Sequence, residues 1–306
     1  MGYRAIQVNN ETGKLKAVIL GIANQFGETP KPAECYDPKS LENVVAGTYP
    51  QEEPLIEQMD GFSKVLKKHG VEVLRPTIID KVNQVFARDI AFVIEDYLFK
   101  PNIIEDRARE WEAIEHYVRE IDPLKVISMP ENTRIEGGDM LLHHNKLFVG
   151  YSKKEDFNTY KVARTNQEGL NFLQEFFPQK EVIGFELNKS DTDPRAGALH
   201  LDCCFQPVGE NKALLCEAGF KHKKDFDYIV NLFGEENCLF LKGEELYHLC
   251  SNIFSISPKV VVSQIEFERV NTWMESKGIT VEAIEYKEVS KMGGLFRCST
   301  MPLIRE

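Results

Sequence analysis

The chain has 306 residues, of which 42% are hydrophobic and 28% are charged, so it is long enough for one large domain or two small ones. Its 48 acidic residues outnumber its 37 basic ones, and the net charge of −11 argues against a general nucleic-acid binder, which needs a basic face. No apolar stretch is long enough to predict a membrane span. The N-terminal residues lack a secretory apolar run, and the seven cysteines form no CxxC pair, so we expect a cytoplasmic protein with reduced thiols. The oligomeric state stays open, a homo-oligomer included.

Short β-branched runs alternate with single helical patterns along the chain. Strands are expected at residues 17–20, 71–74, 90–94, 147–149, 182–185, 213–216, 260–262 and 280–284. Apolar residues at helical spacing predict helices at 53–69, 106–121, 166–177 and 264–277. This alternation predicts an α/β fold, and the even composition favours one domain over residues 1–306. The longest irregular region, from about 24 to 54, is expected to be a functional loop or a surface excursion.

Cys298 is the residue near the end of the chain that carries the most chemical information. It follows Gly293, Gly294 and Arg297, and glycines allow a sharp turn and close approach of a ligand to the backbone. A catalytic thiol must be a thiolate, or become one as substrate arrives, and both Arg297 and a cationic substrate would favour that form. An isolated cysteine is more often a small buried core residue, so a catalytic role for Cys298 depends on the other segments of the chain.

The triplet from His200 to Asp202 combines an imidazole with a carboxylate. If it is part of a strand, His200 and Asp202 point to one face, while Leu201 and Cys203 point to the other. This pairing suits general acid–base chemistry near neutral pH, although an exposed polar strand face would explain the triplet alone. Cys204 would share the face of His200, and for it we favour a packing role.

Two further acidic segments complete the set. Residues 136–139 place two glycines between Glu136 and Asp139. The glycines let the backbone approach a ligand, and the two acids offer it negative charge, although a tight turn would use the same residues. Arg88 is interpreted as one half of a buried salt bridge, and Asp89 as a ligand candidate. A guanidinium presents five donors in a fixed fork, so carboxylates are its natural partners. The set gives no recognisable metal signature, and we expect neither a metal nor another cofactor.

These four segments occur in an order that resembles the guanidino-group-modifying, or pentein, superfamily, in particular its arginine deiminases and amidinotransferases. The N-terminal segment 13–21 resembles the opening strand of the amidinotransferases. The resemblance implies that Cys298 and His200 are a catalytic pair. The acids that it implies for binding the guanidinium are Asp89, Glu136 and Asp202. It also implies residues that bind a substrate carboxylate or another part of the substrate, which are Arg164, Arg107 and Asn83.

The implied fold is a five-bladed α/β propeller of ββαβ units around a pseudo-fivefold axis, with the site in its central channel. The chain is shorter than the bacterial arginine deiminases that it resembles and lacks room for their inserted helical domain. The implied partner is a small guanidino compound. Arginine is favoured over agmatine, because Arg107 and Arg164 are available to bind a substrate carboxylate.

The implied reaction proceeds through a covalent amidino-thioether on Cys298, with His200 as the acid that protonates the leaving amine. Attack by water gives a hydrolase that forms citrulline and ammonia, whereas attack by an amine gives an amidinotransferase. The acidic Glu136 and the deiminase-like tail 299–303 favour the hydrolase. Dimethylarginine hydrolysis, double hydrolysis of arginine to ornithine and a non-catalytic binding module stay open as alternatives.

Overall fold

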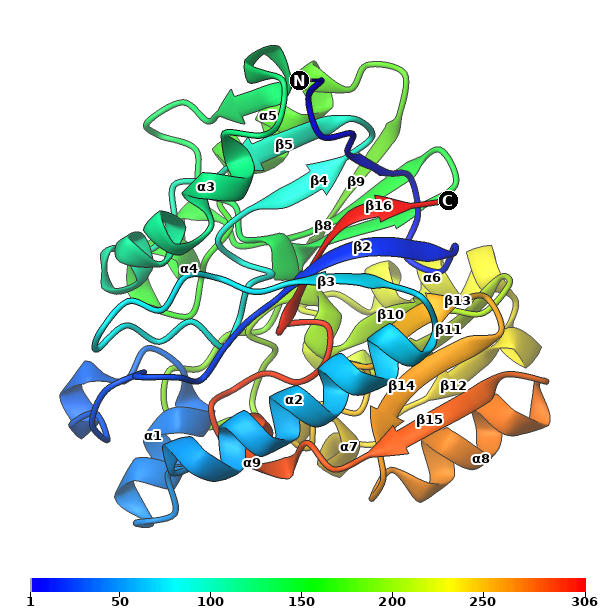
Figure 1. The fold of residues 1–306 in the computed structure, drawn as a ribbon. Helices are drawn as coiled ribbons and strands as arrows, with labels where there is room; N and C mark the ends of the chain where they lie inside the picture. Colours follow the sequence, from blue (N-terminus) through cyan, green and yellow to red (C-terminus); the bar gives the residue numbers. More distant parts are fainter. Residues whose placement is uncertain (1) are drawn as a thin grey trace.

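The computed structural model describes residues 2–306, which form five separate sheets (Figure 1). One sheet has four strands in the order β1-β16-β2-β3, and the other four have three strands each in chain order. The strands are β1 Gln7–Val8, β2 Leu15–Leu20, β3 Glu72–Leu74, β4 Phe92–Ile94, β5 Tyr97–Lys100, β6 Val126–Ser128, β7 Met140–His143, β8 Lys146–Tyr151, β9 Glu181–Glu186, β10 Phe205–Val208, β11 Lys212–Leu215, β12 Cys238–Phe240, β13 Phe254–Ser257, β14 Val260–Gln264, β15 Thr280–Ile284 and β16 Thr300–Arg305.

The five sheets repeat one pattern of pairing. In each three-stranded sheet, two consecutive strands pair antiparallel and the third pairs parallel to the second. The four-stranded sheet follows the same rule, with β16 antiparallel to β2 and β3 parallel to β2. A parallel neighbour needs a crossover connection, and helical segments supply it each time. The predicted α/β class is therefore confirmed, while the closure of the sheets into a propeller stays a prediction.

Nine α-helices lie within residues 2–306, and α2 runs along the four-stranded sheet (Figure 1). They are α1 Pro38–Val45, α2 Glu52–Lys68, α3 Glu115–Val118, α4 Lys154–Thr159, α5 Gln167–Phe176, α6 Lys223–Phe233, α7 Gly243–Tyr247, α8 Glu268–Ser276 and α9 Lys287–Ser290. The helices predicted at 53–69 and 166–177 are confirmed, and the Asn166 side chain caps α5 as expected. None of the helices in residues 2–306 is long and apolar enough to cross a bilayer.

Three segments differ from the sequence prediction. The region 24–54 contains α1, whose first turn is capped by Asp37. The helix predicted at 106–121 is mostly a 3₁₀ helix, Glu105–Ala113, followed by the short α3. Side chains three residues apart eclipse in a 3₁₀ helix, and this turn brings the buried Arg107 and Glu110 together. The helix predicted at 264–277 begins only at Glu268, because Gln264 is the last residue of β14, which pairs with β15.

The strand considered for His200 to Asp202 is not formed. Residues 201–203 form a 3₁₀ turn, and β10 begins only at Phe205. The Leu201 amide donates to the Asp139 carboxylate, and the Cys203 amide donates to the His200 carbonyl. Because these backbone groups are satisfied within the turn, they do not enter a strand ladder, and His200 and Asp202 do not share a strand face.

Candidate active site

The predicted site residues occupy equivalent places in the fold. Asp89, Glu136, His200 and Cys298 each lie shortly before one strand of the antiparallel pair in a sheet, namely β4, β7, β10 and β16. All four side chains are buried, and none is more than 3% exposed. The repeated architecture therefore brings together residues that are far apart in the sequence. This convergence follows from the topology, so a short sequence motif does not reveal it.

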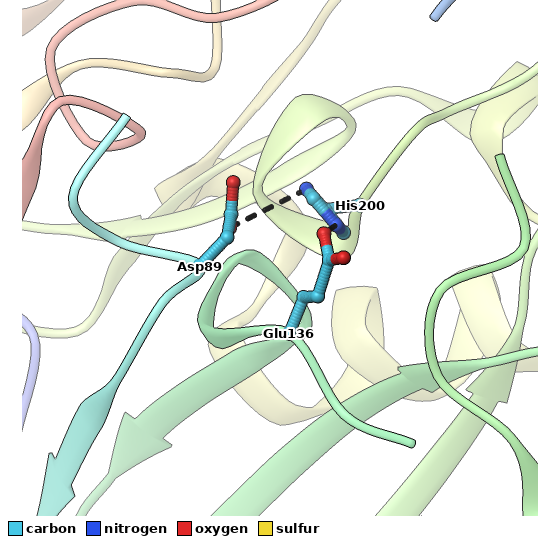
Figure 2. Close-up of side chains that lie close together, drawn as sticks. All are labelled: Asp89, Glu136 and His200. Carbon is cyan, nitrogen blue, oxygen red and sulfur yellow. Dashed lines mark hydrogen bonds and ion pairs between the residues drawn. The ribbon is translucent and has the colours of Figure 1, made fainter. Parts of the chain in front are cut away.

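Three of these residues form one compact cluster, Asp89, Glu136 and His200 (Figure 2). His200 Nε2 lies 2.9 Å from Glu136 Oε2, and His200 Nδ1 lies 3.8 Å from Asp89 Oδ1. The Gly138 amide donates to Asp89 Oδ1 over 3.1 Å. The imidazole is therefore flanked by carboxylates on both of its nitrogens.

The charge state of His200 follows from this environment. Burial of the ring favours the neutral form, but the carboxylates of Asp89, Asp139 and Glu136 outweigh burial and raise the pKa of His200 to about 9. At neutral pH the ring is an imidazolium and can donate a proton. A Cβ on Gly138 would lie 2.6 Å from His200 Nδ1, so the glycine leaves the space that the ring fills.

The two arginines predicted to bind a substrate carboxylate are paired with acids of the site. Arg107 Nη1 lies 2.9 Å from Asp89 Oδ2, and Glu110 holds the same guanidinium. Arg164 Nη1 lies 3.1 Å from each carboxylate oxygen of Glu136. Burial raises the pKa of Glu136, but Arg164, His200 and Arg107 lower it below its usual range. The structure thus supplies partners for both arginines inside the chain, and their predicted contact with substrate stays a prediction.

Asp202 and Cys298 form the second part of the site. Asp202 Oδ2 accepts a hydrogen bond from Arg297 Nη1 over 2.9 Å and lies 3.8 Å from Cys298 Sγ. Glu11 binds the same Arg297 guanidinium through both of its oxygens. Burial raises the pKa of the Cys298 thiol well above its usual value, and the charge of Asp202 adds to the increase. The resting thiol is therefore protonated, and a cation beside it would favour the thiolate.

The remaining sequence predictions fall outside this cluster. Arg88 is buried as predicted, but it forms no salt bridge within residues 2–306: its side chain donates to the Arg297 carbonyl and to Thr300 Oγ1. The carbonyl of Arg297, next to Cys298, thus takes the place of the expected carboxylate. Cys204 packs in the core, as favoured. Asn83 donates to the Tyr36 hydroxyl and lines a cavity of about 100 Å³ with residues of the 24–54 region.

The donor atoms of Asp89, Glu136 and His200 all lie within 4.8 Å of one another, a spacing that a metal ion could use. Arg107 and Arg164 already place positive charge on these two carboxylates. A metal ion would have to compete with both guanidinium groups, so the donor set fits a metal ion poorly. The predicted absence of a metal stays a prediction.

Sequence reasoning missed several residues that build the site. Glu110 and Glu11 hold arginines of the site, and Asn252 contacts Cys298 through both ends of its amide group. Glu110 and Glu11 lie in ordinary charged segments without a local signal. Asn252 lies two residues before β13, and comparison with the residues before β4, β7, β10 and β16 would have singled it out.

Comparison with known proteins places the chain among enzymes that act on guanidino groups. The family described as N,N dimethylarginine dimethylhydrolase, eukaryotic, matches residues 48–305. The uncharacterized protein YkgA of Bacillus subtilis (strain 168) is 28% identical over 252 residues, which cover 81% of this chain and 80% of that protein. Arginine deiminase of Streptococcus uberis is 27% identical over 210 residues, which cover 59% of this chain and 49% of the deiminase. The chain thus spans about half the length of the arginine deiminases that it matches.

The fold is similar to that of solved amidinotransferases. The inosamine-phosphate amidinotransferase StrB1 of Streptomyces griseus matches with a TM-score of 0.75 at 16% identity, over 99% of this chain and 97% of the amidinotransferase. At this identity the likeness shows the fold alone. It agrees with the pattern of five sheets described above.

Proposed function

Because the chain belongs to the N,N dimethylarginine dimethylhydrolase family, and with it to the guanidino-group-modifying (pentein) superfamily, we propose that it is a hydrolase acting on the guanidino group of arginine or a close derivative. The observation that supports this proposal best is the burial of a thiol, an imidazolium and carboxylates at the starts of neighbouring sheets. Carboxylates bind the cation, the thiol attacks its central carbon, and the imidazolium supplies the proton that the leaving amine needs.

The first half of the reaction forms a covalent intermediate. Asp89 and Asp202 accept hydrogen bonds from the guanidinium, whose positive charge lowers the pKa of the Cys298 thiol. The thiol releases its proton, and the thiolate forms a C–S bond to the guanidinium carbon. His200 then donates its proton to the departing nitrogen, the C–N bond breaks, and an amidino-thioether remains on Cys298.

The second half returns the enzyme to its starting state. His200 is now neutral and accepts a proton from water, so hydroxide attacks the amidino carbon. The new hydroxyl group passes its proton to the sulfur as the C–S bond breaks, so a neutral ureido product leaves, Cys298 is again a thiol and His200 is again an imidazolium. Glu136 stabilises the charged imidazolium in both halves through the contact at 2.9 Å.

The finer features follow from the same proposal. We propose that the five sheets are the blades of a propeller over residues 1–306 as one domain, with the site in its central channel. The partner is a small guanidino compound, for which Arg107, Arg164 and Asn83 bind the carboxylate or another polar part. Neither nucleic acid nor membrane is a partner, the protein acts in the cytoplasm, and it requires no cofactor.

The test is product analysis with purified protein. With L-arginine alone, we expect citrulline and ammonia in equal amounts, and no product from the Cys298→Ala variant. Product that appears only when glycine or another amine is supplied would replace the hydrolase with an amidinotransferase. Ornithine with two equivalents of ammonia would indicate a dihydrolase. Stoichiometric binding of arginine without any product would indicate a binding module.

Dimethylarginine hydrolysis is the second candidate, because the matching family carries that name over residues 48–305. In this case N,N-dimethylarginine would yield citrulline and dimethylamine. Methyl groups remove two N–H donors from the guanidinium, so fewer hydrogen bonds reach the acids of the site. A higher kcat/KM for arginine than for dimethylarginine would support the first candidate, and the reverse order would support the second.

A further inference from the structure

In each of the five sheets, a polar residue stands shortly before one strand of the antiparallel pair: β4, β7, β10, β13 or β16. Asp89, Glu136, His200 and Cys298 hold four of these five positions. Asn252 holds the fifth, two residues before β13. Its side chain is fully buried, and the mechanism above assigns it no part.

Both ends of the Asn252 amide contact the turn that carries Cys298. Asn252 Oδ1 accepts hydrogen bonds from the backbone amides of Leu295 and Cys298, each over 3.1 Å. Asn252 Nδ2 lies 3.1 Å from Cys298 Sγ and donates to it. Because the two backbone amides donate hydrogen bonds, the Asn252 side-chain oxygen must point toward them, and its NH₂ group must face Cys298 Sγ. One planar side chain therefore fixes the backbone of the turn and the place of the sulfur together.

We propose that Asn252 is a positioning residue that holds the Cys298 turn and donates a hydrogen bond to the attacking sulfur. This inference rests on the proposed function in one respect, the assignment of Cys298 as the nucleophile. A donor at the sulfur favours the thiolate over the thiol, because the thiolate is the stronger acceptor. The same amide group keeps the sulfur in one place while substrate enters, and placement of reacting atoms contributes strongly to rate.

The charges around the sulfur make this donor important. Burial raises the pKa of Cys298, and the groups of Asp202, Cys203 and Asp89 that face it act in the same direction. The hydrogen bond from Asn252 acts in the opposite direction. Asn252 thus counteracts part of the penalty on the thiolate before a cationic substrate contributes its own charge.

The test distinguishes the loss of the hydrogen-bond donor at Cys298 Sγ from a loss of folding. Asn252→Asp retains the oxygen that accepts from both backbone amides but removes the N–H that faces the sulfur. Asn252→Ser is a smaller second variant. Asn271→Asp is the matched control, because Asn271 in α8 is also buried and its side chain donates to a backbone carbonyl, that of Gln264, and not to the Cys298 turn. The thiolate of Cys298 is titrated by ultraviolet absorbance, with the spectrum of Cys298→Ser subtracted in each background, and melting is followed by circular dichroism.

We expect the titration midpoint of Cys298 to rise by about one pH unit or more in both Asn252 variants, and kcat to fall about tenfold to hundredfold with KM nearly unchanged. Asn271→Asp should change neither. Equal midpoints in wild type and folded variants would overturn the proposal. So would failure of both variants to fold beside a folded Asn271→Asp, because Asn252 would then be a structural residue only. The titration needs no turnover, so it stands even if the wild type lacks the proposed activity.

Discussion

Arg164 and Glu136 form a buried ion pair in which one guanidinium nitrogen contacts both carboxylate oxygens, and each side chain is only 1% exposed. Glu136 also contacts His200. The pair therefore links an arginine of the chain to the imidazole through one shared carboxylate. A substitution at Arg164 should alter both the stability of the protein and the protonation of His200.

Arg164→Met tests this linkage because it retains the length of the side chain and removes its charge. We expect a loss of about 3–5 kcal/mol in the free energy of unfolding, since a buried Glu136 loses its closest cation. Urea unfolding measures the loss. The double variant Arg164→Met with Glu136→Gln should recover a large part of it. An Arg164→Met protein as stable as the wild type would show that the pair contributes little.

Cys298→Ser should abolish turnover with little effect on folding, because a hydroxyl is similar in size but is a far weaker nucleophile than a thiolate. Acid quenching of the wild type during turnover, followed by peptide mass spectrometry, should show an amidino adduct on the peptide that contains Cys298. The serine variant should show none. Turnover by the serine variant at a rate near that of the wild type would exclude the covalent mechanism.

The stability of the protein should fall as pH rises from 7 to 9. The pKa of His200 is raised from its ordinary value of 6.5 to about 9, so the folded state retains a proton that the unfolded chain releases. The stabilisation is complete below 6.5 and is lost as pH passes 9. Glu110 contributes a slope of the same sign at lower pH, because burial raises its pKa from 4.5 to about 7.

Urea unfolding of the wild type and of His200→Gln at several pH values measures this effect. Glu110 is still half protonated in the folded state at its pKa of about 7, so its slope fades only about one pH unit higher. Above that pH, the wild type should lose stability with pH and the variant should lose much less. Parallel curves for the two proteins in that range would mean that the ring is not held as an imidazolium in the folded state.

Gly138→Ala should reduce activity more than stability. Its Cβ would lie 2.6 Å from His200 Nδ1 and 2.9 Å from His200 Cβ, so the ring must shift. Because catalysis depends on the position of the ring, we expect kcat to fall about a hundredfold. Gly61→Ala is the matched control: nothing lies within 4 Å of its added methyl group, and an alanine inside α2 should stabilise the protein by about 1 kcal/mol. Full activity in Gly138→Ala would contradict the tight fit.

The candidate site residues could be picked out from the sequence because each stands in a short segment of unusual composition, and their catalytic roles stay a prediction. Cys298 follows glycines, Glu136 precedes them, and His200 stands two residues before an acid. The structure places all of them at one buried site. The α/β class followed from the spacing of β-branched runs. Each of the eight predicted runs overlaps a strand, but the other eight strands within residues 2–306 were not predicted.

The partners of these residues could not be predicted in the same way. Glu110 faces Arg107 only because residues 105–113 form a 3₁₀ helix, and apolar spacing indicated an α-helix there. The turn at 201–203 depends on the Asp139 carboxylate, which comes from another sheet. Local sequence patterns do not record such long-range contacts, and tertiary context then overrides the local preference.

The pairing of β16 with both β1 and β2 has a consequence for biosynthesis (Figure 1). Strands that emerge early from the ribosome must leave a place open between them until residues 300–305 arrive. Pairing across such a long separation in the chain is slow to form. Cys298 lies two residues before β16, so its contact with Asp202 can form only when the sheet that contains β16 is completed. A nascent chain that has not yet released this strand carries Asp202 and His200 without Cys298 beside them, so the proposed active site is assembled only after residues 300–305 have been synthesised.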